Sequence, residues 1–72
     1  MQTNEAPSAV ILERRRDTAK KLGVSESQLI KWEREGLLQR IDLPGLRAVR
    51  YDARETSALA ERFIEQSRQR NS

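Results

Sequence analysis

The sequence predicts a mainly α-helical domain of three helices with a small β-hairpin. Three observations predict it. Glycines at positions 23 and 36 bound a short segment with apolar residues at helical spacing, a Pro44–Gly45 pair separates two short apolar stretches, and an apolar stripe follows from Thr56 to Ile64. With 72 residues the chain is too short for two domains, and its core must be small.

Composition narrows the possible functions. The chain contains no cysteine and no histidine, which excludes disulfides, thiolate or imidazole metal sites and the commonest general acid-base residue. It also has no glycine-rich phosphate loop and no hydroxyl placed beside a base. We therefore expect a protein that is not an enzyme and that needs no metal, cofactor or small-molecule ligand.

The charge is modestly basic, with 14 Lys and Arg against 11 Asp and Glu and a formal net charge of +3. Eleven of the cations are arginine, which forms planar bidentate contacts with phosphate and guanine. A phosphate-facing surface and an ordinary solvated surface explain this excess about equally well. The longest apolar run, residues 9–12, is far too short for a membrane span or a signal peptide, so we expect a cytoplasmic protein with no membrane partner.

Residues 1–8 are expected to form a disordered arm before a domain that spans residues 9–66. Val10, Ile11 and Leu12 are the first candidate core residues, and we favour a short strand at a sheet edge over the first turn of a helix. Residues 15–22 are predicted to form the first helix, with Thr18, Ala19 and Leu22 on its inner face.

A sharp turn is predicted between this helix and the next, which covers about residues 26–35. Gly23 can take the left-handed conformation that ends a helix, and Ser25 can cap the second helix with Gln28 completing a capping box. Such a helix-turn-helix arrangement projects the second helix far enough to enter the major groove of DNA.

The second helix has two distinct faces when its residues are placed at helical spacing. Leu29 and Trp32 form the buried side. The polar face opposite can donate hydrogen bonds to base edges and phosphates, and Gln28 and Ile30 beside it can contact adenine and a thymine methyl group. We expect Glu33 and Glu35 to pair with arginines. The predicted DNA-contacting residues of this helix are Ser27, Gln28, Lys31 and Arg34.

Residues 39–51 are predicted to form the hairpin, with a loop of about four residues that pairs Asp42 with Arg47. Arg47 and Arg50 are expected to contact phosphate, because a projecting ribbon offers them no core. For Tyr51, a phosphate contact and a purely core role are equally weighted. For Arg14–Arg16, a solvated face is favoured over a phosphate clamp.

The last helix begins after Asp52, with Glu55 completing a capping box, and carries an apolar stripe at Thr56, Leu59, Ala60, Phe63 and Ile64. Residues 67–72 lack apolar side chains and are expected to form a flexible basic tail.

Three segments resemble the MerR-type winged helix, and most closely its stand-alone version in excisionases and small phage-type regulators: residues 19–25, residues 32–38 and residues 49–52. The resemblance implies a winged helix-turn-helix whose second helix enters the major groove and whose hairpin, the wing, contacts the DNA backbone or minor groove. It also implies self-association on adjacent DNA sites and a site-specific integrase as partner, which the protein would direct toward excision in a mobile genetic element. Because the resemblance covers only the first part of full-length MerR regulators, we expect no effector-binding region here and no role as a ligand sensor.

Sequence-specific binding of double-stranded DNA is thus the leading hypothesis. Within DNA binding, the alternative to an excisionase is a small transcriptional repressor or regulator. The alternative from another class is a non-enzymatic adaptor that binds an integrase or a phage packaging component. No heptad seam is evident, so we expect a monomer in the absence of DNA.

Overall fold

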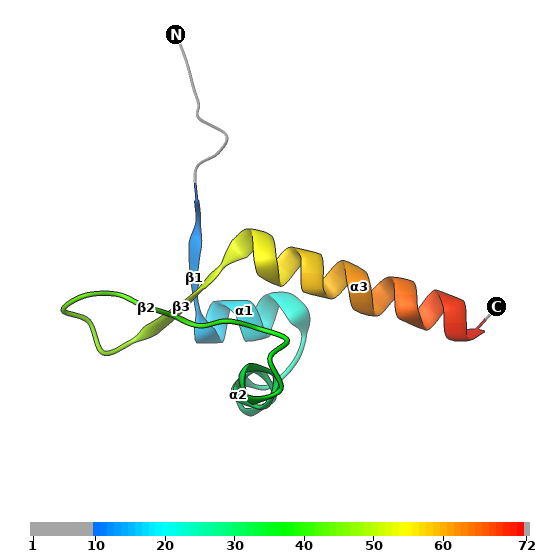
Figure 1. Ribbon diagram of the computed structural model, residues 1–72, viewed down its shortest axis with the longest axis horizontal. Coiled ribbons are helices and arrows are strands. Elements are labelled where there is room, and N and C mark those ends of the chain that lie inside the picture. The colour runs from blue at the N-terminus through cyan, green and yellow to red at the C-terminus, as the bar shows by residue number, and fades with distance from the viewer. Residues whose placement is uncertain (1–9, 72) are drawn as a thin grey trace, which may run out of the picture.

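The computed structural model describes residues 10–71, which form three helices and a three-stranded antiparallel sheet (Figure 1). The fold is therefore mixed α/β, with more sheet than a lone hairpin. In chain order the elements are β1 (Leu12–Arg14), α1 (Arg15–Leu22), α2 (Glu26–Arg34), β2 (Ile41–Asp42), β3 (Val49–Asp52) and α3 (Ala53–Asn71). The expected arm at residues 1–8 lies outside the described residues.

The two short helices and the turn between them agree closely with the prediction. Helix α1 ends at Leu22, and Gly23 follows in the left-handed conformation with φ of 70°. The Ser25 hydroxyl accepts a hydrogen bond from the backbone N–H of Gln28 at 3.1 Å, which satisfies one free donor at the start of α2. Helix α2 then ends at Arg34, just before Gly36 with φ of 79°.

Strand β3 lies at the centre of the sheet, between β1 and β2. The expected edge strand exists, but it is displaced along the chain to Leu12–Arg14. The expectation that Val10 and Ile11 belong to the core is wrong, because they are 53% and 62% exposed. The strand is displaced because Glu13, not an apolar residue, stands opposite the buried Tyr51 on β3. Its carboxylate accepts hydrogen bonds from the buried Thr18 and Thr56.

The hairpin register differs from the prediction by two residues. Asp42 pairs with Val49, not with Arg47, and Ile41 pairs with Arg50. A turn closed by the Leu46 N–H bonding to the Leu43 carbonyl at 3.1 Å places Gly45 at φ of 80°. That turn has the features of type II, whose twist does not suit a tight hairpin, so pairing resumes only after two further residues. The loop therefore covers residues 43–48, longer than the four residues expected.

Helix α3 follows β3 directly and extends away from the body of the molecule (Figure 1). The Asp52 carboxylate accepts a hydrogen bond from the Arg54 N–H at 2.8 Å and so caps the helix. Glu55 does not complete a capping box but accepts a 3.4 Å bond from the backbone N–H of Gln39. The expected tail is also corrected, because residues 67–71 continue α3 as helix.

The core lies where α1, α2 and α3 meet the sheet. Its edge is closed by Trp32, whose ring centroid lies 5.1 Å from that of Phe63. Trp32 is half-buried, at the margin of the core. The fully enclosed apolar side chains come from every layer of the fold: Ala19, Leu29, Leu38, Tyr51 and Leu59.

Candidate nucleic-acid interface

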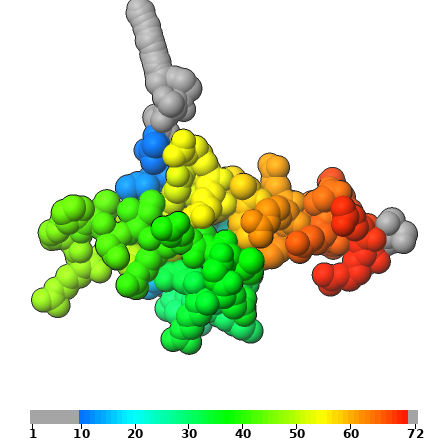
Figure 2. Space-filling model, viewed as in Figure 1, coloured from blue at the N-terminus to red at the C-terminus, as the bar shows by residue number. Residues whose placement is uncertain are grey.

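Helix α2 stands out from the body of the protein at the lower edge of Figure 2. Its inner side is anchored by Leu29, which has no exposed surface. Ser27, Lys31 and Arg34 are exposed on the outside, and Gln28 and Ile30 are half-buried. The structure thus places the predicted polar face of this helix in solvent, with the apolar anchor on the other side.

A cluster of three side chains ties α2 to the rest of the fold. The Arg15 guanidinium on α1 donates to the Glu33 carboxylate on α2 at 2.9 Å and to the Tyr51 hydroxyl on β3 at 2.9 Å. The Tyr51 hydroxyl in turn donates to Glu33. The Arg15 guanidinium carbon also lies 5.9 Å from the centroid of the Tyr51 ring. The expected pairing of Glu33 with an arginine is confirmed.

The same cluster corrects one hypothesis about Tyr51. Its side chain is fully buried and its hydroxyl is bonded to both Arg15 and Glu33, so it is not presented to a phosphate. Tyr51 is a core residue that joins the central strand to the two short helices. Arg15 is half-buried and bonded to Tyr51 and Glu33, whereas its neighbours Arg14 and Arg16 are exposed.

The pKa values of this cluster reflect its partial burial and its hydrogen bonds. Burial raises the pKa of the Glu33 carboxyl, but the bonds from Tyr51 and Arg15 outweigh it, so the pKa lies below the ordinary value of 4.5. Burial, reinforced by the bond to Glu33, raises the pKa of the Tyr51 hydroxyl. The bond to Tyr51 raises the pKa of Arg15, and the bond to Glu33 adds to that effect. Glu33 is therefore ionised at neutral pH and Arg15 is charged.

A second cluster, which the sequence analysis did not identify, lies on β1, α1 and α3. The Glu13 carboxylate accepts bonds from Thr18 at 2.8 Å, Thr56 at 2.9 Å and Lys21 at 2.7 Å. Burial raises the pKa of Glu13, but these three bonds outweigh that effect, so the pKa lies below its ordinary value of 4.5. Thr18 and Thr56 are fully buried, so this cluster is a structural polar contact, and no spacing in the sequence indicated it.

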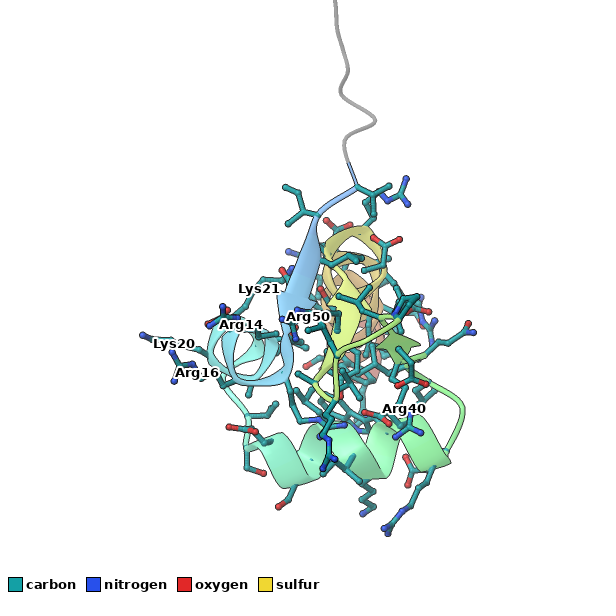
Figure 3. The ribbon with its side chains drawn as sticks, turned by 90° about the vertical axis from the view of Figure 1, so that its left-hand side faces the viewer. Arg14, Arg16, Lys20, Lys21, Arg40 and Arg50 are labelled. Atoms are coloured by element: carbon teal, nitrogen blue, oxygen red, sulfur yellow. The ribbon has the colours of Figure 1, made fainter. Side chains whose placement is uncertain are left out.

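The hairpin carries the remaining predicted DNA contacts. Arg47 lies exposed in the loop, and Arg50 lies half-buried in β3 with its guanidinium donating to the Val49 carbonyl at 3.0 Å. Figure 3 looks onto this end of the molecule and shows Arg14 and Arg16 beside α1, Arg50 near the middle and Arg40 on the other side. Arg40 forms a long ion pair with Asp42 at 3.7 Å.

A groove of about 480 Å³ separates the start of α1 from the hairpin. We call it the arginine groove, because arginines from both sides make up most of its wall. It brings two predicted residues of the hairpin together with the arginine run at positions 14–16, for which the sequence favoured a solvated face. The lining residues are Arg14, Arg15, Arg16, Glu26, Arg47, Ala48, Val49 and Arg50.

The predicted contact residues therefore fall into two sets in space. Ser27, Gln28, Lys31 and Arg34 belong to α2, and Arg47 and Arg50 belong to the arginine groove, which α2 touches only through its first residue, Glu26.

No family model, curated protein or solved structure matches the chain. Within residues 10–71, no three side chains of the metal-ligating types lie close enough together to hold a metal ion. In that same part of the chain, no helix combines the length and apolar character needed to cross a bilayer.

Proposed function

We propose that this protein binds double-stranded DNA in a sequence-specific manner, with the outer face of α2 in the major groove. In this proposal α1, the turn at Gly23 and α2 form a helix-turn-helix, and the β2–β3 hairpin is its wing. The observation that carries the proposal is that one helix is held by a buried Leu29 and an internal ion pair of Glu33, while its opposite face presents exposed polar and cationic groups.

The chemistry of that face suits DNA. The major groove is wide enough to admit an α-helix, and its base edges offer donors and acceptors to side chains. Lys31 and Arg34 are exposed and supply positive charge for phosphates and guanine. Ser27 and Gln28 add neutral hydrogen-bonding groups at the N-terminal end of the helix. Glu33, the acid between these cations, is turned inward to Arg15 and so does not oppose a phosphate.

The experiment is a gel-shift titration on DNA that flanks the gene encoding this chain, with excess competitor DNA and at several salt concentrations. Lys31→Ala and Arg34→Ala are expected to weaken binding, and each lost phosphate contact makes the negative slope of log K against log salt shallower by about 0.9. Arg68→Ala, a single-charge change near the far end of α3, is the matched control and should leave binding almost unchanged.

If the unchanged protein shows no specific shift, or if Lys31→Ala and Arg34→Ala bind DNA as well as it does, the proposal fails. The adaptor hypothesis would then account better for the fold, since an adaptor would keep its affinity for a protein partner when these cations are removed.

Within DNA binding, we propose an excisionase-like architectural role in which copies bind adjacent sites and direct an integrase toward excision. The support is the resemblance of three sequence segments to stand-alone MerR-type winged helices. A repressor would use the same contacts without deforming its site, so DNA bending separates the two roles.

A further inference from the structure

The arginine groove carries a large excess of positive over negative side chains. Five arginines line it against one carboxylate, that of Glu26. Arg15 is paired internally with Glu33, but no ion pair within residues 10–71 joins a carboxylate to Arg14, Arg16, Arg47 or Arg50. Four arginines that form no ion pair within the described residues thus line a groove of about 480 Å³.

The sheet register makes this arrangement unfavourable in the free protein. Arg14 on β1 stands directly opposite Arg50 on β3. Like charges directly opposite one another on antiparallel strands destabilise the sheet. A ligand that carries negative charge into the groove would relieve this repulsion, whereas an uncharged or cationic ligand would not.

We propose that the arginine groove binds the phosphodiester backbone of the same DNA duplex whose major groove α2 enters, an inference that rests on the proposed function. Arg14 and Arg16 hold the strand from the α1 side, and Arg47 and Arg50 hold it from the hairpin side. This assigns DNA contacts to two residues for which the sequence favoured a solvated face. It also places the hairpin beside a strand that is gripped from both sides.

The position of the groove supports this occupant. Glu26, the first residue of α2, forms part of the groove wall, so the groove adjoins the N-terminal end of the helix that carries Ser27 and Gln28. The strand that borders a major groove runs next to any helix inserted into it. Phosphate contacts at this point would fix the register of α2 on the duplex.

The test is the double variant Arg14→Gln/Arg16→Gln, compared with Arg68→Gln/Arg70→Gln, which removes the same charge near the end of α3. Binding is measured by fluorescence anisotropy at several salt concentrations, on the specific site and on an unrelated duplex. The groove variant is expected to bind both duplexes more weakly, and its negative slope of log K against log salt should be shallower by about 2. The control variant should keep the slope of the unchanged protein.

Thermal unfolding of the free protein distinguishes a binding role from a structural one. Because Arg14 opposes Arg50 in the sheet, the midpoint of Arg14→Gln/Arg16→Gln is expected to stay the same or to rise while DNA binding falls. Glu26→Gln probes the same groove without touching an arginine. Removing this carboxylate should strengthen binding severalfold on both duplexes.

The outcomes separate this inference from the proposed function. If the unchanged protein binds no duplex specifically, the proposed function fails and this inference fails with it. If it binds specifically but Arg14→Gln/Arg16→Gln keeps its affinity and salt slope, or Glu26→Gln leaves binding unchanged, the groove inference is overturned while the role of α2 stands. A parallel loss in the control variant would also overturn it, because the effect would then follow net charge alone.

Discussion

The Glu33 side chain holds α2 to the rest of the fold, while the opposite face of this helix is exposed. It lies on α2 beside exposed cations, yet its carboxylate accepts from both Arg15 and Tyr51. Three elements, α1, α2 and β3, therefore meet at one carboxylate. Hydrogen bonds to ionised groups are about twice as strong as neutral ones, so the charge of Glu33 matters as well as its shape.

The stability contributed by Glu33 depends on pH in a defined direction. Its pKa is lower in the folded protein than its ordinary value of 4.5, so the contribution is complete above pH 4.5 and is lost as the pH falls through the folded pKa. Glu33→Gln is expected to lower the free energy of unfolding by about 1–2 kcal/mol at pH 7. Urea denaturation of both proteins from pH 7 to pH 3 measures this difference.

The difference in unfolding free energy between the unchanged protein and Glu33→Gln should narrow below pH 4.5. Glu33 becomes protonated there, so the unchanged protein loses the charge that the variant lacks. Glu13, whose pKa is also lowered, titrates alike in both and cancels in the comparison. Glu35→Gln, at an exposed residue, is the control and should change stability by less than about 0.5 kcal/mol. A gap that stays constant with pH would contradict this assignment of the ion pair.

At the scale of the element, the stability of α2 depends on the side-chain cap at its N-terminus. The hydroxyl of Ser25 is the only side-chain acceptor shown for the free N–H groups of its first turn in the described chain. Ser25→Ala should therefore cost about 1 kcal/mol of unfolding free energy, and Ser25→Asp, which keeps an acceptor oxygen, should restore most of it. Chemical denaturation of the three proteins decides this. Equal losses in both variants would contradict the prediction, because the loss would then not follow the acceptor oxygen.

Elements with local signals could be predicted from the sequence, and elements set by distant pairing could not. Gly23 and Ser25 act on their immediate neighbours, so the bounds of α1 and the start of α2 followed from the residues alone. The register of the hairpin depends on where pairing resumes after the Pro44–Gly45 turn, and two extra loop residues moved Arg47 out of the ladder. The arginine groove depends in turn on that register and on the pairing of β1 with β3. No local pattern could therefore show that residues 14–16 and 47–50 share one site.

At the scale of the whole molecule, α2 and the hairpin project from different parts of the surface (Figures 1 and 2). In the proposed complex, contacts from both would pull on a duplex at two separated points. We expect the excisionase-like complex to bend its site, with the pull strongest where arginines of the hairpin meet the backbone. Fluorescence energy transfer between dyes at the two ends of a short duplex measures the bend. A straight duplex at saturating protein would favour the repressor.

The division of α2 into an anchored side and a free side has a consequence for how proteins of this design can diverge. Arg15, Glu33 and Tyr51 depend on one another, so a change at one of them would have to be matched at the others for the helix to keep its orientation. Ser27, Lys31 and Arg34 are exposed, so each of them can change without a matching change elsewhere in the fold. If α2 reads DNA as proposed, related chains could therefore acquire new target sequences by exchanging outward residues of this one helix, while the residues that hold it stay the same.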